Sequence, residues 1–344
     1  MQPSLLAACL AFPAVSSSSP MPPGETVALE TRPVRSWQVV MPAERSIPVG
    51  SGIAFAHAGG PRFIAHSEGE RLRVDVDGDG TLDALVEGEE GFVTLTQTAA
   101  DGRVTQYSAR LTRTAGQPWH YTFGSVRTGE FRGTKLQLVD QNLNGRFDDF
   151  GEDALVVGRD VAASFLSRVV SIEGQLYELE VASDGTSCTL SPHLGESGVL
   201  DLGGAFRSQA KLHAAIVVSD DGRNSFSVAR ATGGLRVPAG AYRLHSGQIV
   251  LSDAHATIKG GSRSRFEVAS GAIVRPEWGG PVRAEFAVQR DGDQLGFTPW
   301  DIWYYGALGE EYSNFMPLGT SPEFTIRERQ SGDVLVYTRF PGNC

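Results

Sequence analysis

Short segments of alternating polar and apolar residues, separated by Asp-Gly turns, limit how this chain can fold more than any other feature. Alternation with a period of two is typical of half-buried β-strands, and residues 71–74 and 135–139 show it clearly. Asp-Gly supplies the positive φ angle of a tight hairpin at little steric cost, and it occurs at 101–102, 184–185, 221–222 and 291–292. Several hairpins in series predict an all-β fold of two or three antiparallel, β-sandwich-like units with short loops.

Helix is expected to contribute little. The chain has 41 glycines without a triplet period, which indicates many turns rather than long helices. The best helical candidate is residues 159–170, which would form about three turns with a weak apolar face.

Composition shifts and the strand pattern predict five regions. These are a signal segment at 1–19, a proline-rich linker with the first strands at 20–50, a β domain at 51–160, a β-sandwich at 161–263 and an immunoglobulin-like β-sandwich at 264–344.

The N-terminal region has the length of a secretory signal rather than of a membrane span. An apolar run from Leu5 to Val15 precedes a serine tract, although no Lys or Arg comes before the run. An alternative is a lipid anchor through Cys9, because Leu6-Ala7-Ala8-Cys9 is similar to the lipobox of bacterial lipoproteins. We therefore expect a secreted, periplasmic or surface protein. Its remaining cysteines, Cys188 and Cys344, either form one disulfide or stay free.

Two acidic loops have the spacing of a calcium site. The ligand positions 1, 3, 5, 7 and 9 hold, in the first loop, Asp75, Asp77, Asp79, Thr81 and Asp83. In the second loop the same positions hold Asp140, Asn142, Asn144, Arg146 and Asp148. Glycine at position 6 permits the sharp bend, and position 7 offers its backbone carbonyl. Carboxylate and amide oxygens suit Ca²⁺ and do not suit zinc or copper.

These loops resemble the calcium loops of integrins, dockerins and EF-hands at the positions just named. Position 12, where an EF-hand has a bidentate Glu, holds Val86 in the first loop and Gly151 in the second. The flanking segments are strands, so the integrin-like β-hairpin is the better analogy. Asp149 or Glu152 could add a ligand to the second loop. Affinity is then expected in the range of extracellular modules, roughly 10⁻⁵ to 10⁻³ M. The alternative is that both loops are plain Asx-Gly turns whose acids face solvent.

A weak internal repeat relates the loops. Residues 73–83 align with residues 138–148, and a short apolar strand follows each of them, at 84–86 and 154–157. Strand, acidic loop and strand therefore occur twice.

A further segment, residues 211–245, resembles part of the carboxypeptidase-regulatory-like β-sandwiches. The resemblance is carried by Pro238-Ala239-Gly240-Ala241-Tyr242, which matches a Pro-Xaa-Gly-Xaa-Tyr turn between the last strands. It implies an accessory or structural sandwich without catalytic residues.

Other chemistries find little support in the sequence. A net charge of −10 argues against a nucleic-acid partner. The seven histidines lack zinc-hydrolase spacing, and no nucleophile elbow or phosphate-binding glycine loop occurs. Trp278, Trp300 and Trp303 could stack on a sugar, although core packing is the commoner explanation of aromatic residues in strands.

The function expected from the sequence is that of an exported, calcium-binding, non-enzymatic structural or adhesive protein of the cell envelope. Polysaccharide or a cell-surface protein is the expected partner. A carbohydrate-binding module and a polysaccharide hydrolase or lyase are the alternatives.

Overall fold

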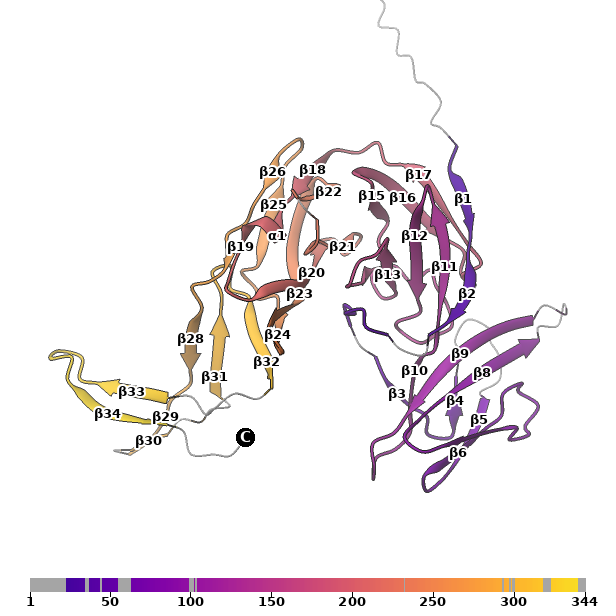
Figure 1. Ribbon diagram of the computed structural model, residues 1–344, viewed down its shortest axis with the longest axis horizontal. Coiled ribbons are helices and arrows are strands. Elements are labelled where there is room, and N and C mark those ends of the chain that lie inside the picture. Colours follow the sequence, from indigo (N-terminus) through magenta and orange to yellow (C-terminus); the bar gives the residue numbers. More distant parts are fainter. Residues whose placement is uncertain are drawn as a thin grey trace, which may run out of the picture.

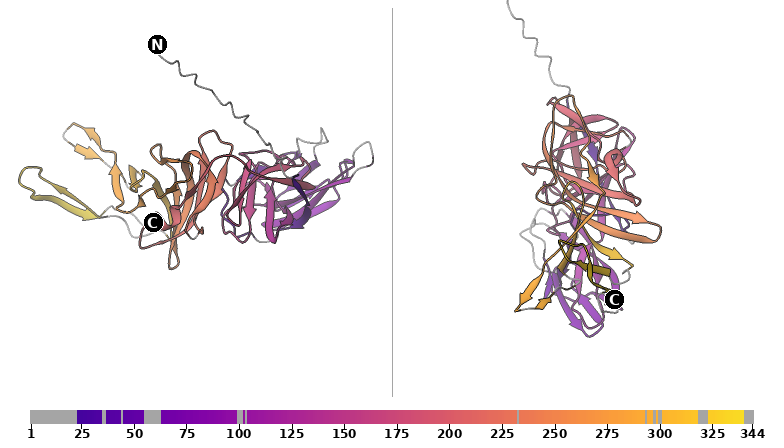
Figure 2. Two further views of the ribbon diagram at one scale, coloured as in Figure 1. Left: turned by 90° about the horizontal axis from the view of Figure 1, so that it is seen from above. Right: turned by 90° about the vertical axis from the view of Figure 1, so that its left-hand side faces the viewer.

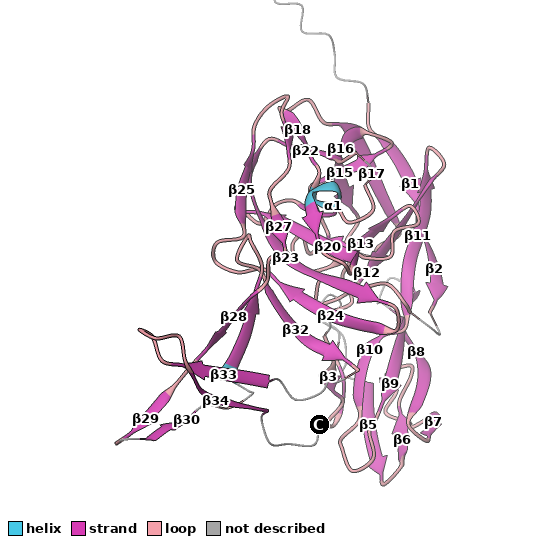
Figure 3. Cartoon of the chain, turned by 60° about the vertical axis from the view of Figure 1, so that its left-hand side comes forward, coloured by secondary structure: helices cyan, strands magenta, loops and turns pink. Residues whose placement is uncertain are grey.

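The computed structural model describes residues 23–34, 37–43, 45–54, 63–98, 102, 104–231, 233–292, 294–296, 298, 301–317 and 323–339. Strands and loops make up nearly all of this part of the chain, together with one short helix, α1 (Leu202–Ala205) (Figure 3). Its sheets are almost entirely antiparallel, so the predicted all-β fold is confirmed. Among these residues no helix is long and apolar enough to cross a membrane. Three β units follow one another in an elongated arch (Figures 1 and 2).

The first β unit, residues 47–123, contains two four-stranded sheets. One has the order β3-β10-β9-β8, from β3 (Ile47–Pro48), β8 (Glu90–Thr98), β9 (Val104–Thr112) and β10 (His120–Phe123). The other runs in chain order through β4 (Gly52–Ile53), β5 (Phe63–Glu68), β6 (Arg71–Val74) and β7 (Ala84–Glu87). Alternate side chains of both sheets form one apolar core, in which Ile53, Leu72 and Leu111 are fully buried.

The second β unit combines residues 25–33 with residues 125–192. Its first sheet has the order β1-β17-β16-β15, from β1 (Glu25–Ala28), β15 (Val169–Ile172), β16 (Gln175–Val181) and β17 (Ser187–Pro192). Its second sheet has the order β14-β13-β12-β11-β2, from β2 (Glu30–Pro33), β11 (Ser125–Phe131), β12 (Thr134–Val139), β13 (Ala154–Val157) and β14 (Ser164–Phe165). The chain therefore forms the first strands of the second unit, then the whole first unit, and then the remaining strands of the second unit. Residues 51–160, expected to be one domain, supply strands to both.

The third β unit, residues 197–316, is dominated by a large sheet of order β21-β20-β23-β24-β32-β31-β28, with β25 also paired to β23. Its strands are β20 (Lys211–Ser219), β21 (Ser225–Ser227), β23 (Gly240–Leu251), β24 (Ala254–Lys259), β25 (Arg265–Val268), β28 (Arg283–Phe286), β31 (Ile302–Tyr305) and β32 (Glu311–Met316). Smaller sheets contain β18 (Ser197–Leu200), β19 (Phe206–Arg207), β22 (Leu235–Pro238), β26 (Ile273–Val274) and β27 (Trp278–Gly279). Two of their pairings, β18 with β26 and β19 with β27, are parallel.

Residues 264–339 do not form a separate sandwich in the part that the structure describes. Strands β25, β28, β31 and β32 extend the large sheet of the third unit. Strands β26 and β27 pair with β18 and β19 of the third unit. The other strands form two separate hairpins, β29 (Gln289–Asp291) with β30 (Gln294–Gly296) and β33 (Glu323–Arg327) with β34 (Val334–Arg339). The side chains of β34 are all exposed, which places this hairpin outside the apolar cores.

The predicted Asp-Gly turns do join hairpins. They connect β8 to β9, β16 to β17, β20 to β21 and β29 to β30, and each pair is antiparallel. The four glycines at these turns, Gly102, Gly185, Gly222 and Gly292, have φ between 58° and 81°. The sequence therefore located these turns correctly, because glycine adopts this left-handed backbone at little steric cost.

The Pro-Xaa-Gly-Xaa-Tyr segment carries the chain from one sheet of the third unit to another. Pro238 ends β22, which pairs with β18, and Gly240 begins β23, which pairs with β20. The buried Tyr242 hydroxyl donates a hydrogen bond to the Pro238 carbonyl (2.9 Å). This bond fixes the crossover, as tyrosine corners do in other sandwiches.

The helix predicted over residues 159–170 is wrong. This segment is a loop that ends in β14 and leads into β15. Asp160 Oδ1 accepts hydrogen bonds from the backbone N–H groups of Val161 (2.7 Å) and Ala162 (3.3 Å), which offers the backbone an alternative to helical bonding. Ala163 N–H then donates to the Val40 carbonyl (2.9 Å), so a distant segment satisfies the groups that a helix would use.

Cys188 lies on β17 and is buried, and burial raises the pKa of its thiol to about 11. Cys9, Cys344 and the expected signal segment lie outside the described residues, so the anchor and the disulfide remain predictions.

Candidate metal centre

The first acidic loop connects β6 to β7 in an antiparallel hairpin. Val74 pairs with Ala84 at its base, and the side chains of Leu72 and Val74 are anchored in the core of the first unit. The strand, loop, strand order read from the sequence is therefore confirmed here. The hairpin holds the loop ends together while the loop itself reaches solvent.

Asp75 organises the backbone of this loop. It is almost completely buried, with only 1% of its surface exposed. Its Oδ1 accepts hydrogen bonds from the N–H groups of Asp77 (3.2 Å) and Gly78 (2.7 Å), and its Oδ2 accepts one from Gly80 (2.9 Å). Gly78 and Gly80 have φ of 79° and 91°, a conformation that strains other residues. One carboxylate thus closes the turn from position 1 to position 6.

Four carboxylates of this loop converge. Ligand oxygens of Asp75, Asp77, Asp79 and Asp83 all lie within 4.8 Å of one another, and the last three residues are exposed. Asp79 also accepts a hydrogen bond from Thr81 N–H (2.6 Å), which fixes its orientation. No described Lys or Arg side chain forms an ion pair with any of the four. Like charges at this separation repel, and a bound cation would relieve that repulsion. The cluster could therefore hold a metal ion.

The second loop connects β12 to β13 and begins with the same turn. Asp140, which is 1% exposed, accepts hydrogen bonds from the N–H groups of Asn144 (3.1 Å) and Gly145 (2.7 Å). The bond from Gly145 to Asp140 Oδ2 repeats the bond from Gly80 to Asp75 Oδ2 five residues after each loop begins. The repeat seen in the sequence is therefore a repeat of backbone structure.

Beyond this turn the side chains of the second loop satisfy one another. The amide nitrogens of Asn142 and Asn144 donate to Asp149 Oδ2 (3.0 and 2.6 Å). The Arg146 guanidinium binds both oxygens of Asp148 (3.0 and 2.9 Å). Asp148 is thus engaged by a cation of the chain itself. Among the described residues, the group of acidic ligands close enough to share an ion is the one in the first loop.

Other polar side chains near the second loop also have partners within the chain, unlike the carboxylates of the first loop. Glu152, considered as an additional ligand, forms an ion pair with Arg45. Gln141 is buried and bridges two segments, accepting from Ala43 N–H (3.1 Å) and donating to the Glu152 carbonyl (2.8 Å). The ligand role expected for the backbone carbonyls of Thr81 and Arg146 remains a prediction.

Asp153 is a site residue that sequence spacing did not identify. In the first hairpin Val74 pairs with Ala84, directly after Asp83, and in the second Val139 pairs with Ala154, directly after Asp153. Strand register therefore makes Asp153, rather than Asp148, the counterpart of Asp83. A signal was present, because Asp-Ala-Leu-Val follows both loops, at 83–86 and 153–156. The second loop simply has five more residues before it.

Asp140 and Asp153 are both withdrawn from solvent. Burial raises the pKa of Asp140 to about 6, against the hydrogen bonds from Gly145 and Asn144 that lower it. Burial, and then the nearby Asp140 charge, raise the pKa of Asp153 to about 8. Asp153 Oδ2 accepts from Asp149 N–H (3.1 Å), while its buried Oδ1 has no hydrogen-bond partner among the described residues. Buried carboxylates are costly when ionised, and the hydrogen bonds to these two offset only part of that cost.

The second loop also joins two units. Leu143, which has φ of 62°, is buried in the apolar core of the first unit although the loop belongs to the second. Tyr107 of the first unit lies against Asp140, and burial followed by that charge raises the Tyr107 pKa well above its usual value. The second loop is therefore part of a packed junction.

The aromatic platform predicted for the C-terminal region loses one of its members. Trp278 is fully buried, donates its indole N–H to the Leu202 carbonyl (2.8 Å) and packs on Phe206. Trp300 lies outside the described residues, and Trp303 is 36% exposed. Trp278 is a core residue and is not available to stack on a sugar.

Comparison of the chain with models of protein families, with curated proteins and with solved structures finds no match. The chemistry of the site therefore has to be argued from its own residues.

Proposed function

We propose that the first loop binds calcium. The observation that carries this proposal is the convergence of four aspartates on one point of an exposed hairpin, with no cationic side chain of the described residues to neutralise them. Calcium accepts six to eight oxygen ligands in flexible geometry, and the loop offers carboxylate oxygens together with water. Magnesium demands near-ideal octahedral geometry, and zinc prefers nitrogen and sulfur, so both fit this donor set less well.

The role that follows is structural rather than catalytic or signalling. An exposed site without a bidentate Glu at position 12 belongs to the affinity class of extracellular modules, roughly 10⁻⁵ to 10⁻³ M, which fill where calcium is abundant. Together with the N-terminal segment 1–19, this supports an exported protein of the cell envelope with a structural or adhesive task. Calcium would neutralise the loop and hold β6 against β7.

We assign the second loop a weaker calcium affinity. Asp140, Asn142, Asn144 and Asp153 are its ligand set, with Asp153 replacing Asp148. Two amides stand where the first loop has carboxylates, and Arg146 places a positive charge beside the site. Both features lower the attraction for a divalent cation.

Thermal unfolding with calcium and with a chelator tests the proposal. A ligand that binds only the folded state stabilises it by about 2.7 kcal/mol at a hundredfold excess over Kd. We expect calcium to raise the Tm of the wild type and of Asp253→Ala, an exposed aspartate in another turn, but to raise it much less in Asp79→Ala. An equal calcium shift in the wild type and in Asp79→Ala would refute binding at the first loop.

A further inference from the structure

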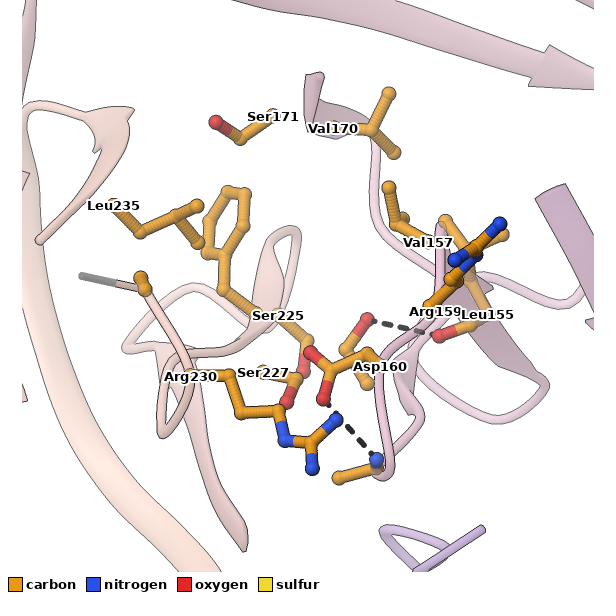
Figure 4. A pocket seen from close by; sticks show the side chains of 14 residues that line it. Leu155, Val157, Arg159, Asp160, Val170, Ser171, Ser225, Ser227, Arg230 and Leu235 are labelled. Atoms are coloured by element: carbon orange, nitrogen blue, oxygen red, sulfur yellow. Dashed lines mark hydrogen bonds between the residues drawn. The ribbon is translucent and has the colours of Figure 1, made fainter. Parts of the chain in front are cut away.

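A cavity of about 280 Å³ lies between the second and third β units. Its wall from the second unit is formed by β13, the loop after it and β15, and its wall from the third unit by β21 and the segment that follows (Figure 4). Ligand pockets range from about 300 to 1,000 Å³, so this cavity suits a ligand the size of one sugar ring. It lies apart from the two acidic loops, and neither loop lines it.

The walls are tied together, so the cavity is already formed in the protein. Phe165 N–H donates to Ser225 Oγ, and Ser225 N–H donates to Ser167 Oγ, both at 3.1 Å. Asn224 Oδ1 accepts from Val169 N–H at the same distance. These bonds cross from one unit to the other, and they fix the relative position of the groups that face the cavity. A preformed site avoids part of the ordering cost of binding.

Two of the lining hydroxyls are unsatisfied. Ser171 Oγ and Ser227 Oγ are buried and have no hydrogen-bond partner among the described residues, although each lines the cavity. Buried hydroxyls normally find a partner, because leaving one without a hydrogen bond costs about 1 to 3 kcal/mol. They come from opposite walls, Ser171 from β15 and Ser227 from β21. A ligand rich in hydroxyl groups would satisfy both.

The charged lining groups define the charge of the ligand. Arg159 follows β13 and Arg230 follows β21, so the guanidinium groups reach the cavity from different units (Figure 4). Asp160 points toward Arg230, and its Oδ1 is held by the N–H groups of Val161 and Ala162. The two guanidinium groups and the Asp160 carboxylate leave the cavity with one net positive charge, which an anionic ligand would match. Neither Arg159 nor Arg230 forms an ion pair within the described residues, but the Asp160 carboxylate lies on the Arg230 side of the cavity (Figure 4), so the unmatched charge is assigned to Arg159.

An apolar side completes the cavity. Val157, Val170, Phe226 and Leu235 line it, and Figure 4 shows Leu235 on the side opposite Val157 and Arg159. Sugar rings present C–H groups on their faces and hydroxyls at their edges, so they fit a site with apolar walls and a few placed polar groups.

We propose that this cavity binds a monosaccharide-sized sugar acid, such as a hexuronic acid unit. Its carboxylate would bind the Arg159 guanidinium, for which bidentate geometry is favourable. Its hydroxyls would bind Ser171, Ser227, Asp160 and Arg230, and its ring would rest on the apolar side. The proposal does not depend on calcium at the acidic loops.

Titration calorimetry with the full chain tests it, using glucuronate and galacturonate, the neutral sugars glucose and galactose, and sulfate. We expect a uronate to bind and the other probes to bind at least about tenfold more weakly, since a charge-assisted contact is roughly twice as strong as a neutral one. Arg159→Ala should abolish the preference for the acid over the neutral sugar. Arg230→Ala should weaken both, and Arg329→Ala, an exposed arginine on a distant hairpin, should change neither.

Several outcomes would overturn the proposal. They are the absence of uronate binding at millimolar concentrations, sulfate binding as tight as uronate binding, and uronate affinity that is unchanged in Arg159→Ala. Ser171→Ala and Ser227→Ala provide a second readout. They remove an unsatisfied hydroxyl, so they should leave the Tm unchanged or raised while weakening uronate affinity. Weakened affinity with a lowered Tm would point to a structural role instead.

Discussion

The two acidic loops begin with the same turn and end beside the same strand sequence, but the protein gives them different surroundings. The first protrudes from a hairpin, and three of its four converging aspartates are exposed. The second lies at the junction of two units, with Asp140 and Asp153 buried and Leu143 packed into the neighbouring core. The comparison shows that the spacing of the ligand residues determines the turn, whereas burial and neighbouring side chains determine how much unneutralised negative charge the loop carries.

The difference has a simple electrostatic basis. In the first loop the carboxylates are neutralised by no described cationic side chain, so an ion from solution is the available counter-charge. In the second loop Arg146 and two asparagine amides already contact the partly buried Asp148 and Asp149. We therefore expect the first loop to respond mainly to calcium and the second mainly to pH.

The largest expected effect is the pH dependence of stability with a chelator present. Asp140 and Asp153 have raised folded-state pKa values, about 6 and about 8, so the folded protein holds protons that the unfolded chain releases. Their contribution is fully present below about pH 4 and is lost as pH rises through about 6 and then 8. For Asp140 alone the loss is on the order of 3 kcal/mol. Denaturant unfolding from pH 4 to pH 9 measures it.

Matched variants assign this effect to the second loop. Asp140→Asn and Asp153→Asn should each flatten the pH profile in chelator, whereas Asp79→Asn in the first loop should leave its shape unchanged. A profile that stays steep in both second-loop variants would show that other groups cause it.

The next effect, about tenfold or more in calcium affinity, would come from giving the second loop the charges of the first. The triple variant Asn142→Asp, Asn144→Asp and Arg146→Met adds two carboxylates and removes the competing guanidinium. We expect a second calcium ion to bind with an affinity near that of the first, because nearby opposite charges dominate such sites. Calorimetric stoichiometry is the measurement. Stoichiometry equal to the wild type would mean that burial, not charge, limits the second loop.

Much of this arrangement could be predicted from the sequence. The hairpins at Asp184-Gly185 and Asp221-Gly222 follow from local backbone chemistry, and so does the turn that Gly80 and Gly145 close. Asp153 was missed because counting from Asp140 ignores an insertion, whereas strand pairing shows that Asp153 corresponds to Asp83.

Other features depend on contacts between distant parts of the chain. The burial of Trp278 depends on Leu202 and Phe206, more than 70 residues away. The loop at 159–163 takes its bonds from Val40, and β1 and β2 pair with strands beyond the first unit. Local propensity carries no information about such partners, which is why the expected helix is wrong and why Trp278 is a core residue rather than part of an aromatic platform.

A smaller effect distinguishes Asp153 from Asp148 as the ligand of the second loop. We expect Asp153→Asn to weaken the weaker calcium site severalfold, because it removes a carboxylate at the position that strand register assigns to the ion. Asp148→Asn should change that site little, since Asp148 is engaged by Arg146. Calcium titration of both variants in the Asp79→Ala background isolates the second loop. A larger effect of Asp148→Asn than of Asp153→Asn would show that Asp148, as the ligand spacing predicts, is the ligand.

The smallest expected effect concerns what the two loops share. Gly80 and Gly145 have φ of 91° and 82°, and each donates its N–H to the first aspartate of its loop. Alanine at either position would be held in the left-handed region at a cost of about 1 kcal/mol. A Cβ at Gly80 meets no atom within 4 Å, so strain alone should set the loss there. Chemical denaturation in chelator should give similar losses for Gly80→Ala and Gly145→Ala, because the turn is the same in both loops. A much larger loss for Gly145→Ala would show that the junction also constrains this turn, and the two loops would then differ even in the element that their spacing has in common.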